Sequence, residues 1–222
     1  MVDAALQRLN MVESQVRPSD VVDRRILAAM SNIEREKFVP VAKRSLAYMD
    51  EAIQLEAESG ASARVLLPPR LLAKMIQNLE LEDSDLVLDI ACATGYSTAV
   101  LAAIAQTVVG LECDVGLADQ ATKALGESGV DNAVVVRGAL LEGYPNEGPY
   151  DAILVNGAIT ELPDGLLDQL KDGGRLVAIQ AGEGVSRAAQ WRRFDTNFDH
   201  RRIFDAAAPI LPGCEMTREF VF

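Results

Sequence analysis

The sequence predicts an α/β protein built on a doubly wound, mostly parallel seven-stranded sheet, with helices before the sheet and antiparallel strands after it. Three observations predict this class. Residues Val87–Tyr96 have the pattern of a strand, a tight turn of small residues and the start of a helix. Short apolar runs then alternate with helical patterns as far as Ile179. Beyond Ile179, strand patterns follow one another without helices.

Helical patterns dominate the N-terminal part of the chain. Apolar residues at helical spacing predict a first helix over 4–16, which Arg17-Pro18 should end. Ser19 or Asp20 is the expected cap of a second helix, and a short helical turn should cover 33–40. The weakly apolar stretch 50–63 predicts a loop with one short strand. The apolar face of the second helix is expected to consist of Val22, Ile26, Leu27 and Met30.

Pro68-Pro69 predicts the start of the helix that precedes the sheet, because proline suits the first helical turn. Parallel strands are expected at Leu86–Ile90, Thr107–Leu111, Ala133–Val136, Ala152–Val155 and Gly174–Ile179. Strand patterns that suggest an antiparallel edge follow at Arg187–Phe194, Arg201–Ala206 and Glu215–Phe222. The expected helices between them are Ser97–Ala105, Gly116–Leu125 and Pro163–Leu170. We expect a single domain over 1–222, with a helical N-terminal appendage (1–64), a cofactor-binding core (65–182) and antiparallel edge strands (183–222).

The composition argues against several classes of protein. A net charge of -12 over 222 residues disfavours nucleic acid and anionic membranes as partners, because both require a concentrated positive surface. No apolar run reaches the ~18 residues that span a bilayer. Three widely spaced cysteines fit reduced thiols, so a cytoplasmic location is expected. With one histidine and no close cysteine pair, we expect no metal site.

Candidate ligand-binding residues follow the first two strands of the predicted sheet. In this fold class, ligands bind beyond the carboxyl ends of the strands. Glu112 ends the second strand, 17 residues after Gly95, where an acid can accept hydrogen bonds from both ribose hydroxyls of a nucleoside. If the turn needs left-handed backbone at Ala91 or Ala93, each alanine costs about 1–2 kcal/mol. The remaining candidates for this pocket are Asp89, Cys92, Gly95 and Cys113.

Several blocks of the chain resemble the protein-L-isoaspartate O-methyltransferase family, a group of class I S-adenosylmethionine-dependent methyltransferases with a Rossmann-like fold. The most specific blocks are N-terminal, and the similarity runs from about residue 6 to about 213. The blocks are Met11–Pro18, Asp23–Met30, Arg35–Pro40, Leu46–Tyr48, Tyr150–Val155 and Leu167–Val177.

The resemblance implies methyl transfer from S-adenosylmethionine to the α-carboxyl group of isoaspartyl residues in damaged proteins, which begins their repair. It also implies isoaspartyl proteins or peptides as partners. A carboxylate is already a nucleophile, so positioning would be the enzyme's main contribution.

The chain departs from the family pattern at the implied site. Leu67 stands where the family has a serine beside the cofactor and the substrate carboxylate, and Ala139 stands where it has an acid beside the adenine. Asn156 is a candidate cofactor contact, and Asn156 and Arg70 are candidate substrate contacts. Three functions therefore stay open: the family's methyl transfer, weakened or lost; a non-catalytic binding protein; and a methyltransferase with another acceptor, with Leu66 and Leu67 lining an apolar pocket.

Overall fold

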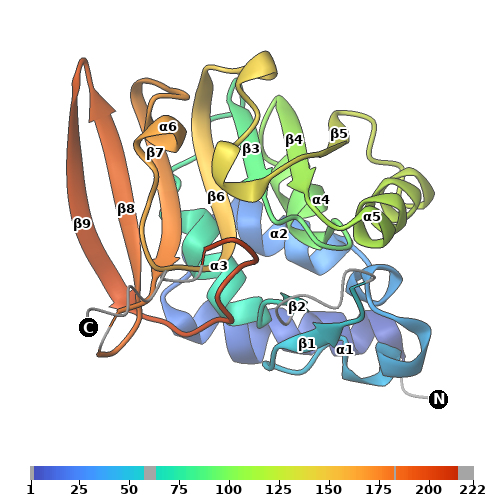
Figure 1. Ribbon diagram of the computed structural model, residues 1–222. Coiled ribbons are helices and arrows are strands. Elements are labelled where there is room, and N and C mark those ends of the chain that lie inside the picture. The colour runs from blue at the N-terminus through green and yellow to red at the C-terminus, as the bar shows by residue number, and fades with distance from the viewer. Residues whose placement is uncertain (1–2, 58–63, 183, 215–222) are drawn as a thin grey trace, which may run out of the picture.

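The computed structural model describes residues 3–57, 64–182 and 184–214. Within these ranges the chain forms a seven-stranded sheet in the order β5-β4-β3-β6-β7-β8-β9, and β1 and β2 pair separately. Figure 1 shows the sheet with the N-terminal helices beneath it and β8 and β9 at one edge. The helices are α1 (Ala4–Met11), α2 (Arg24–Asn32), α3 (Pro69–Gln77), α4 (Tyr96–Ala102), α5 (Val115–Glu127) and α6 (Asp164–Leu167). The strands are β1 (Ile53–Leu55), β2 (Arg64–Leu66), β3 (Leu86–Ile90), β4 (Thr107–Glu112), β5 (Ala133–Arg137), β6 (Tyr150–Ile159), β7 (Leu170–Gln180), β8 (Arg187–Phe194) and β9 (Asn197–Asp205).

The predicted fold class is confirmed. Strands β5, β4, β3, β6 and β7 pair in parallel, and β8 and β9 add an antiparallel hairpin to β7. The strand order reverses beside β3, since β4 and β5 lie on one side of it and β6 and β7 on the other. In an open sheet of this kind, the crevice at such a reversal is where ligands bind.

Alternate residues of the central strands face two separate apolar clusters, as the period of two in a strand requires. Val87 belongs to the cluster that contains the N-terminal helices, α3 and α4. Leu88 belongs to the cluster on the other face, with α6 and Trp191. The buried residues of the N-terminal segment therefore share a core with the sheet. The division into an appendage, a core and edge strands stays a prediction.

The N-terminal helices differ from expectation at their ends. The predicted helix over 4–16 continues past α1 as a π-helical turn over Val12–Val16, and a 3₁₀ turn then runs through Arg17–Ser19. The cap of α2 is Asp23, which accepts a hydrogen bond from the backbone N–H of Arg25. Ser19 and Asp20 were the wrong candidates because the 3₁₀ turn uses Ser19, and Asp20 ends it in left-handed backbone. Val22 precedes the helix and is 78% exposed, so placing it on the apolar face was also wrong.

The short strand predicted within 50–63 is confirmed as β1, which pairs antiparallel with β2 just beyond that stretch. Several other boundaries were wrong. Strand β6 continues to Ile159, so that Asn156 lies inside it, and Asn197 begins β9. The predicted helix over Pro163–Leu170 shrinks to α6, because Leu170 already begins β7 and pairs with Tyr150. The strand expected at Glu215–Phe222 lies outside the described residues.

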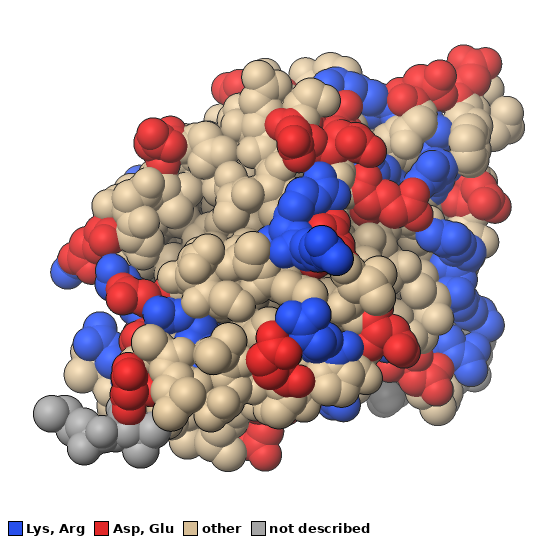
Figure 2. All heavy atoms as spheres, turned by 180° about the vertical axis from the view of Figure 1, so that it is seen from behind, with Lys and Arg blue, Asp and Glu red and all other residues tan. Residues whose placement is uncertain are grey.

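Charged side chains of both signs are mixed over the face seen in Figure 2, and basic ones gather along the edge where the β8–β9 hairpin lies. Arg192 and Arg201 of this hairpin both pair with Glu80. Arg187 pairs with Asp205 within the hairpin. Carboxylates therefore accompany these arginines, as expected for a solvated sheet edge.

Candidate functional site

Asp89 lies at the centre of the sheet, opposite Gly110 of β4 and Leu154 of β6. Its buried carboxylate accepts hydrogen bonds from Ser97 Oγ at 2.7 Å and Thr98 Oγ1 at 2.6 Å, both from α4. The side-chain amide of Asn156 donates a third. Burial raises the pKa of Asp89 to about 7, although these hydrogen bonds oppose the shift. Asp89 and Asn156, both predicted cofactor contacts, thus bind each other.

The turn between β3 and α4 has the backbone form that favours glycine. The φ angles of Ala91, Ala93 and Gly95 are 61°, 53° and 91°. At Gly95 an added Cβ would also lie 3.2 Å from the Cβ of Ala121 in α5. Both alanines are buried and hold left-handed backbone, which costs about 1–2 kcal/mol for each one.

Glu112 ends β4 and is completely buried, but its carboxylate is bound by an arginine of this chain. Arg64 Nη1 donates to Glu112 Oε1 at 2.8 Å, and Arg64 Nη2 donates to Oε2 at 2.5 Å. Three backbone N–H groups donate to the same carboxylate, from Ala93, Cys113 and Asp114. A guanidinium therefore lies where the sequence predicts the ribose of a nucleoside.

Leu67 covers the turn from the side of the N-terminal segment. Its backbone carbonyl accepts a hydrogen bond from Arg35 Nη2 at 2.9 Å. Arg35 is completely buried, and its guanidinium lies 4.5 Å from the centre of the Tyr96 ring. Burial lowers the pKa of Arg35, and the electrostatic interaction with the neighbouring Tyr96 opposes this effect. Arg35 thus fixes the segment that carries Leu67.

One cavity between this segment and the turn, lined by described residues, measures about 10 Å³. That is room for about one water molecule, whereas ligand pockets typically measure about 300–1,000 Å³. Its lining residues are Arg35, Val65, Leu66, Leu67, Leu72, Ala91, Cys92, Ala93, Tyr96, Ser97 and Asn156. A hollow of about 440 Å³ lies at the β7–β8 connection, and none of the predicted cofactor contacts lines it.

The remaining predicted residues lie at different distances from the turn. Cys92 is buried, and a Cβ on Gly110 would meet its sulfur at 3.2 Å, so it packs against β4. Cys113 Sγ lies 3.5 Å from Glu112 Oε1 and 3.7 Å from Arg64 Nη1. Ala139 is exposed and precedes the 3₁₀ turn Leu140–Glu142. Arg70 is exposed and pairs with Asp50 at 3.0 Å.

The described residues, arranged in this way, do not fit a nucleoside cofactor. The carboxylate expected to bind a ribose is occupied by Arg64, and the adjoining cavity is far too small for an adenosyl group. Asp89 is likewise engaged by three side chains of its own chain. The assignment of individual cofactor and substrate contacts therefore stays a prediction.

Neither the pairing of Arg64 with Glu112 nor the hydrogen bond from Arg35 to the backbone of Leu67 is predicted by the sequence. A buried acid after a strand requires a donor or cation, but the chain has 21 lysines and arginines and their spacing does not select one. Arg64 comes close only because β2 pairs with β1, a contact between short segments that carry little periodic signal. Among the described residues, no group of three or more histidines, cysteines and acids is placed to hold a metal ion. No helix in that part of the chain is long and apolar enough to cross a membrane.

Comparison with known proteins identifies similar sequences over nearly the whole chain. Residues 7–206 match the family model for protein-L-isoaspartate(D-aspartate) O-methyltransferase. A protein-L-isoaspartate O-methyltransferase of Rhodopseudomonas palustris is 41% identical over 207 residues, 92% of this chain and 93% of the relative. One from Methanoculleus marisnigri is 41% identical over 172 residues, 78% of this chain and 76% of the relative.

Solved structures support the same fold. A protein-L-isoaspartate O-methyltransferase matches with a TM-score of 0.81 at 24% identity, over 93% of this chain and 66% of that one, slightly less than two thirds of its length. A putative enzyme of this type from Plasmodium falciparum, in complex with S-adenosyl-L-homocysteine, matches with a TM-score of 0.76 at 18% identity, over 90% of this chain and 96% of that one. At these identities the likeness concerns the fold alone.

Proposed function

Because this chain belongs to the protein-L-isoaspartate O-methyltransferase family, we propose that it is an S-adenosylmethionine-dependent methyltransferase that acts on isoaspartyl residues of damaged proteins. The acceptor would be the α-carboxyl group of the isoaspartyl residue, and its methylation begins repair of the protein. The observation that carries this proposal is the family match over residues 7–206, which includes the N-terminal blocks as well as the common core. A cytoplasmic location stays a prediction.

A second candidate is a non-catalytic relative that keeps the fold and binds another partner. The occupation of Glu112 by Arg64 and the cavity of about 10 Å³ favour it. A methyltransferase with a different acceptor is the third candidate, because Leu67 offers no hydroxyl group to a carboxylate.

Two measurements separate these candidates. If S-adenosylmethionine or S-adenosylhomocysteine binds, ligand at ~100 times its dissociation constant adds ~2.7 kcal/mol to the free energy of unfolding. For a domain of this size, the melting temperature rises by roughly 5–10 °C. No shift at millimolar ligand would contradict both enzyme candidates.

Transfer of a labelled methyl group to an isoaspartyl peptide, with the matching aspartyl peptide as control, then identifies the acceptor. Methylation of the isoaspartyl peptide alone is the result expected for the repair enzyme. Cofactor binding without methylation of either peptide would contradict the isoaspartyl acceptor.

A further inference from the structure

The pair of Arg64 and Glu112 is buried more completely than any other ion pair within the described residues. Their side chains are 2% and 0% exposed, and both nitrogens of the guanidinium fork bind the carboxylate. Burial of an ion pair requires that most of the lost hydration be replaced by hydrogen bonds. The backbone N–H groups of Ala93, Cys113 and Asp114 provide those bonds on the side of the acid.

The carboxylate of Glu112 has no acceptor site left for a ligand. An ionised carboxylate offers about four lone-pair positions on its two oxygens. Oε1 accepts from Arg64 Nη1, Cys113 N and Asp114 N, and Oε2 accepts from Arg64 Nη2 and Ala93 N. A ribose hydroxyl can bind this carboxylate only if one of these donors leaves. The three backbone donors belong to the turns that follow β3 and β4, which the sheet, α4 and α5 hold in place, so Arg64 is the donor that can move.

The position of Arg64 in the fold supports this choice. It is the first residue of β2, which pairs only with β1 in a ribbon separate from the main sheet. Figure 1 shows this ribbon beside the N-terminal helices and apart from the strands of the large sheet. Withdrawal of Arg64 therefore breaks no hydrogen bond of the seven-stranded sheet.

We propose that Arg64 occupies the ribose position of the nucleoside pocket and competes with an S-adenosyl ligand for Glu112. In the folded protein the pocket is closed by its own chain, and a ligand binds only to the fraction of molecules in which Arg64 has left the carboxylate. The apparent affinity is reduced by that fraction. This inference rests on the proposed function for the identity of the ligand.

The main test is the affinity of S-adenosylhomocysteine for the Arg64→Gln variant, measured by isothermal titration calorimetry. Glutamine removes the charge and the fork but leaves the three backbone donors to hold the carboxylate. We expect binding to Arg64→Gln to be at least about tenfold tighter than to the wild type. The double variant Arg64→Gln, Glu112→Gln should lose this gain, because the amide replaces the carboxylate that the ribose would bind.

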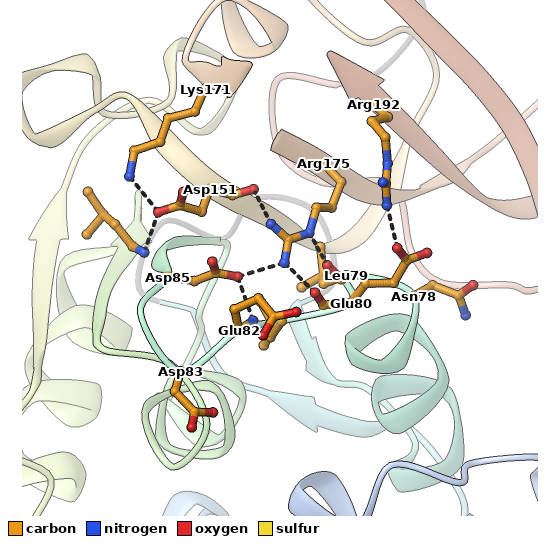
Figure 3. Close-up of polar contacts among 12 residues, drawn as sticks. Asn78, Leu79, Glu80, Glu82, Asp83, Asp85, Asp151, Lys171, Arg175 and Arg192 are labelled. Atoms are coloured by element: carbon orange, nitrogen blue, oxygen red, sulfur yellow. Dashed lines mark hydrogen bonds and ion pairs between the residues drawn. The ribbon is translucent and has the colours of Figure 1, made fainter. Parts of the chain in front are cut away.

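Arg175 provides a matched control. It forms a second buried pair, with Asp85 at 2.7 Å, in which the side chains are 10% and 7% exposed. Figure 3 shows its guanidinium among Asp85 and the backbone of Leu79, Glu80 and Asp151, at the end of the sheet where β3 and β6 begin. Arg175→Gln therefore removes a comparable charge far from the nucleoside pocket, and it should leave the affinity unchanged.

Several results would overturn the proposal. These are equal affinities of the wild type and Arg64→Gln, no binding to Arg64→Gln at millimolar ligand, or an equal gain in Arg175→Gln. If Arg64→Gln does not fold, Arg64→Lys keeps the charge without the fork, and a smaller gain is expected. A crystal structure of the wild type with S-adenosylhomocysteine adds an independent measurement. A bound ribose with Arg64 still on Glu112 would contradict the competition.

The proposed function and this inference can fail separately. If Arg64→Gln gains affinity but neither protein methylates the isoaspartyl peptide, the competition stands and the acceptor is wrong. If the wild type methylates the peptide and both proteins bind the ligand equally, the function stands and Arg64 is not a competitor.

Discussion

Replacement of Asp89 by asparagine should change how the stability of this protein depends on pH. The carboxyl group is completely buried, and burial raises its pKa from 3.8 to about 7 in the folded chain. The nearby charge of Glu112 adds to the shift, whereas hydrogen bonds from Ser97, Thr98 and Asn156 oppose it. Asparagine has the same shape and no charge, so Asp89→Asn removes the titration and retains the packing.

The direction follows from which state binds the proton. Between pH 3.8 and about 7 the folded protein retains the proton of Asp89 and the unfolded chain loses it. The free energy of unfolding therefore falls as pH rises through this range and levels off above it. At 1.36 kcal/mol per pH unit, the whole range corresponds to about 4 kcal/mol. The Asp89→Asn variant does not lose this stability. Its free energy of unfolding relative to that of the wild type should therefore increase by up to about 4 kcal/mol as pH rises from 3.8 to about 7.

Urea denaturation followed by circular dichroism, at several values between pH 4 and pH 8, measures the difference. Other titrating groups are common to both proteins and cancel in the comparison. Glu13→Gln provides a flat control, because the hydrogen bond from Arg17 lowers the pKa of Glu13 below 4.5 and its contribution to stability is lost only as pH falls below that value. Its difference from the wild type should therefore stay nearly constant over most of this range. A difference between Asp89→Asn and the wild type that stays constant, or grows as pH falls, would refute the reasoning.

Three further predictions concern residues around the site and the sheet. Ala93→Gly should destabilise the protein by about 1–2 kcal/mol less than Ala99→Gly in α4, in chemical denaturation, because both methyls are buried but only Ala93 has positive φ. Equal losses would contradict the backbone strain. Arg175→Gln should lower the free energy of unfolding by about 3–5 kcal/mol, and Arg201→Gln, whose side chain is 55% exposed, by less than about 1 kcal/mol. Cys113 is exposed and should react with a thiol reagent in the native state, and the rate should rise with pH because the thiolate is the reactive form. Partial desolvation and the nearby Glu112 raise the pKa of this thiol, so the rise should continue above pH 9, whereas the two buried cysteines should react only on unfolding. Rapid native labelling of all three would contradict the burial.

The turn between β3 and α4 could be predicted from the sequence only in part. Spacing alone places Glu112 at the end of a strand beside the turn, and the structure confirms that Ala93 N and Glu112 are neighbours. The sequence also shows alanine at two positions of the turn, Ala91 and Ala93, where left-handed backbone would be costly. The structure gives them φ angles of 61° and 53°, so both residues are strained. A φ angle depends on how the flanking strand and helix are joined in space, and residue type alone does not determine it.

The fold class and the family could be determined from the sequence by itself. The reason is that local periodicity reports burial on one or two faces, and the N-terminal blocks have a recognisable order. Only the tertiary structure decided which group lies on Glu112. Arg64 and Glu112 are 48 residues apart, and they meet because the β1–β2 ribbon carries Arg64 to the carboxyl end of β4. Pairing between distant charges leaves no periodic trace in a single sequence, so the closed pocket could not be read from it.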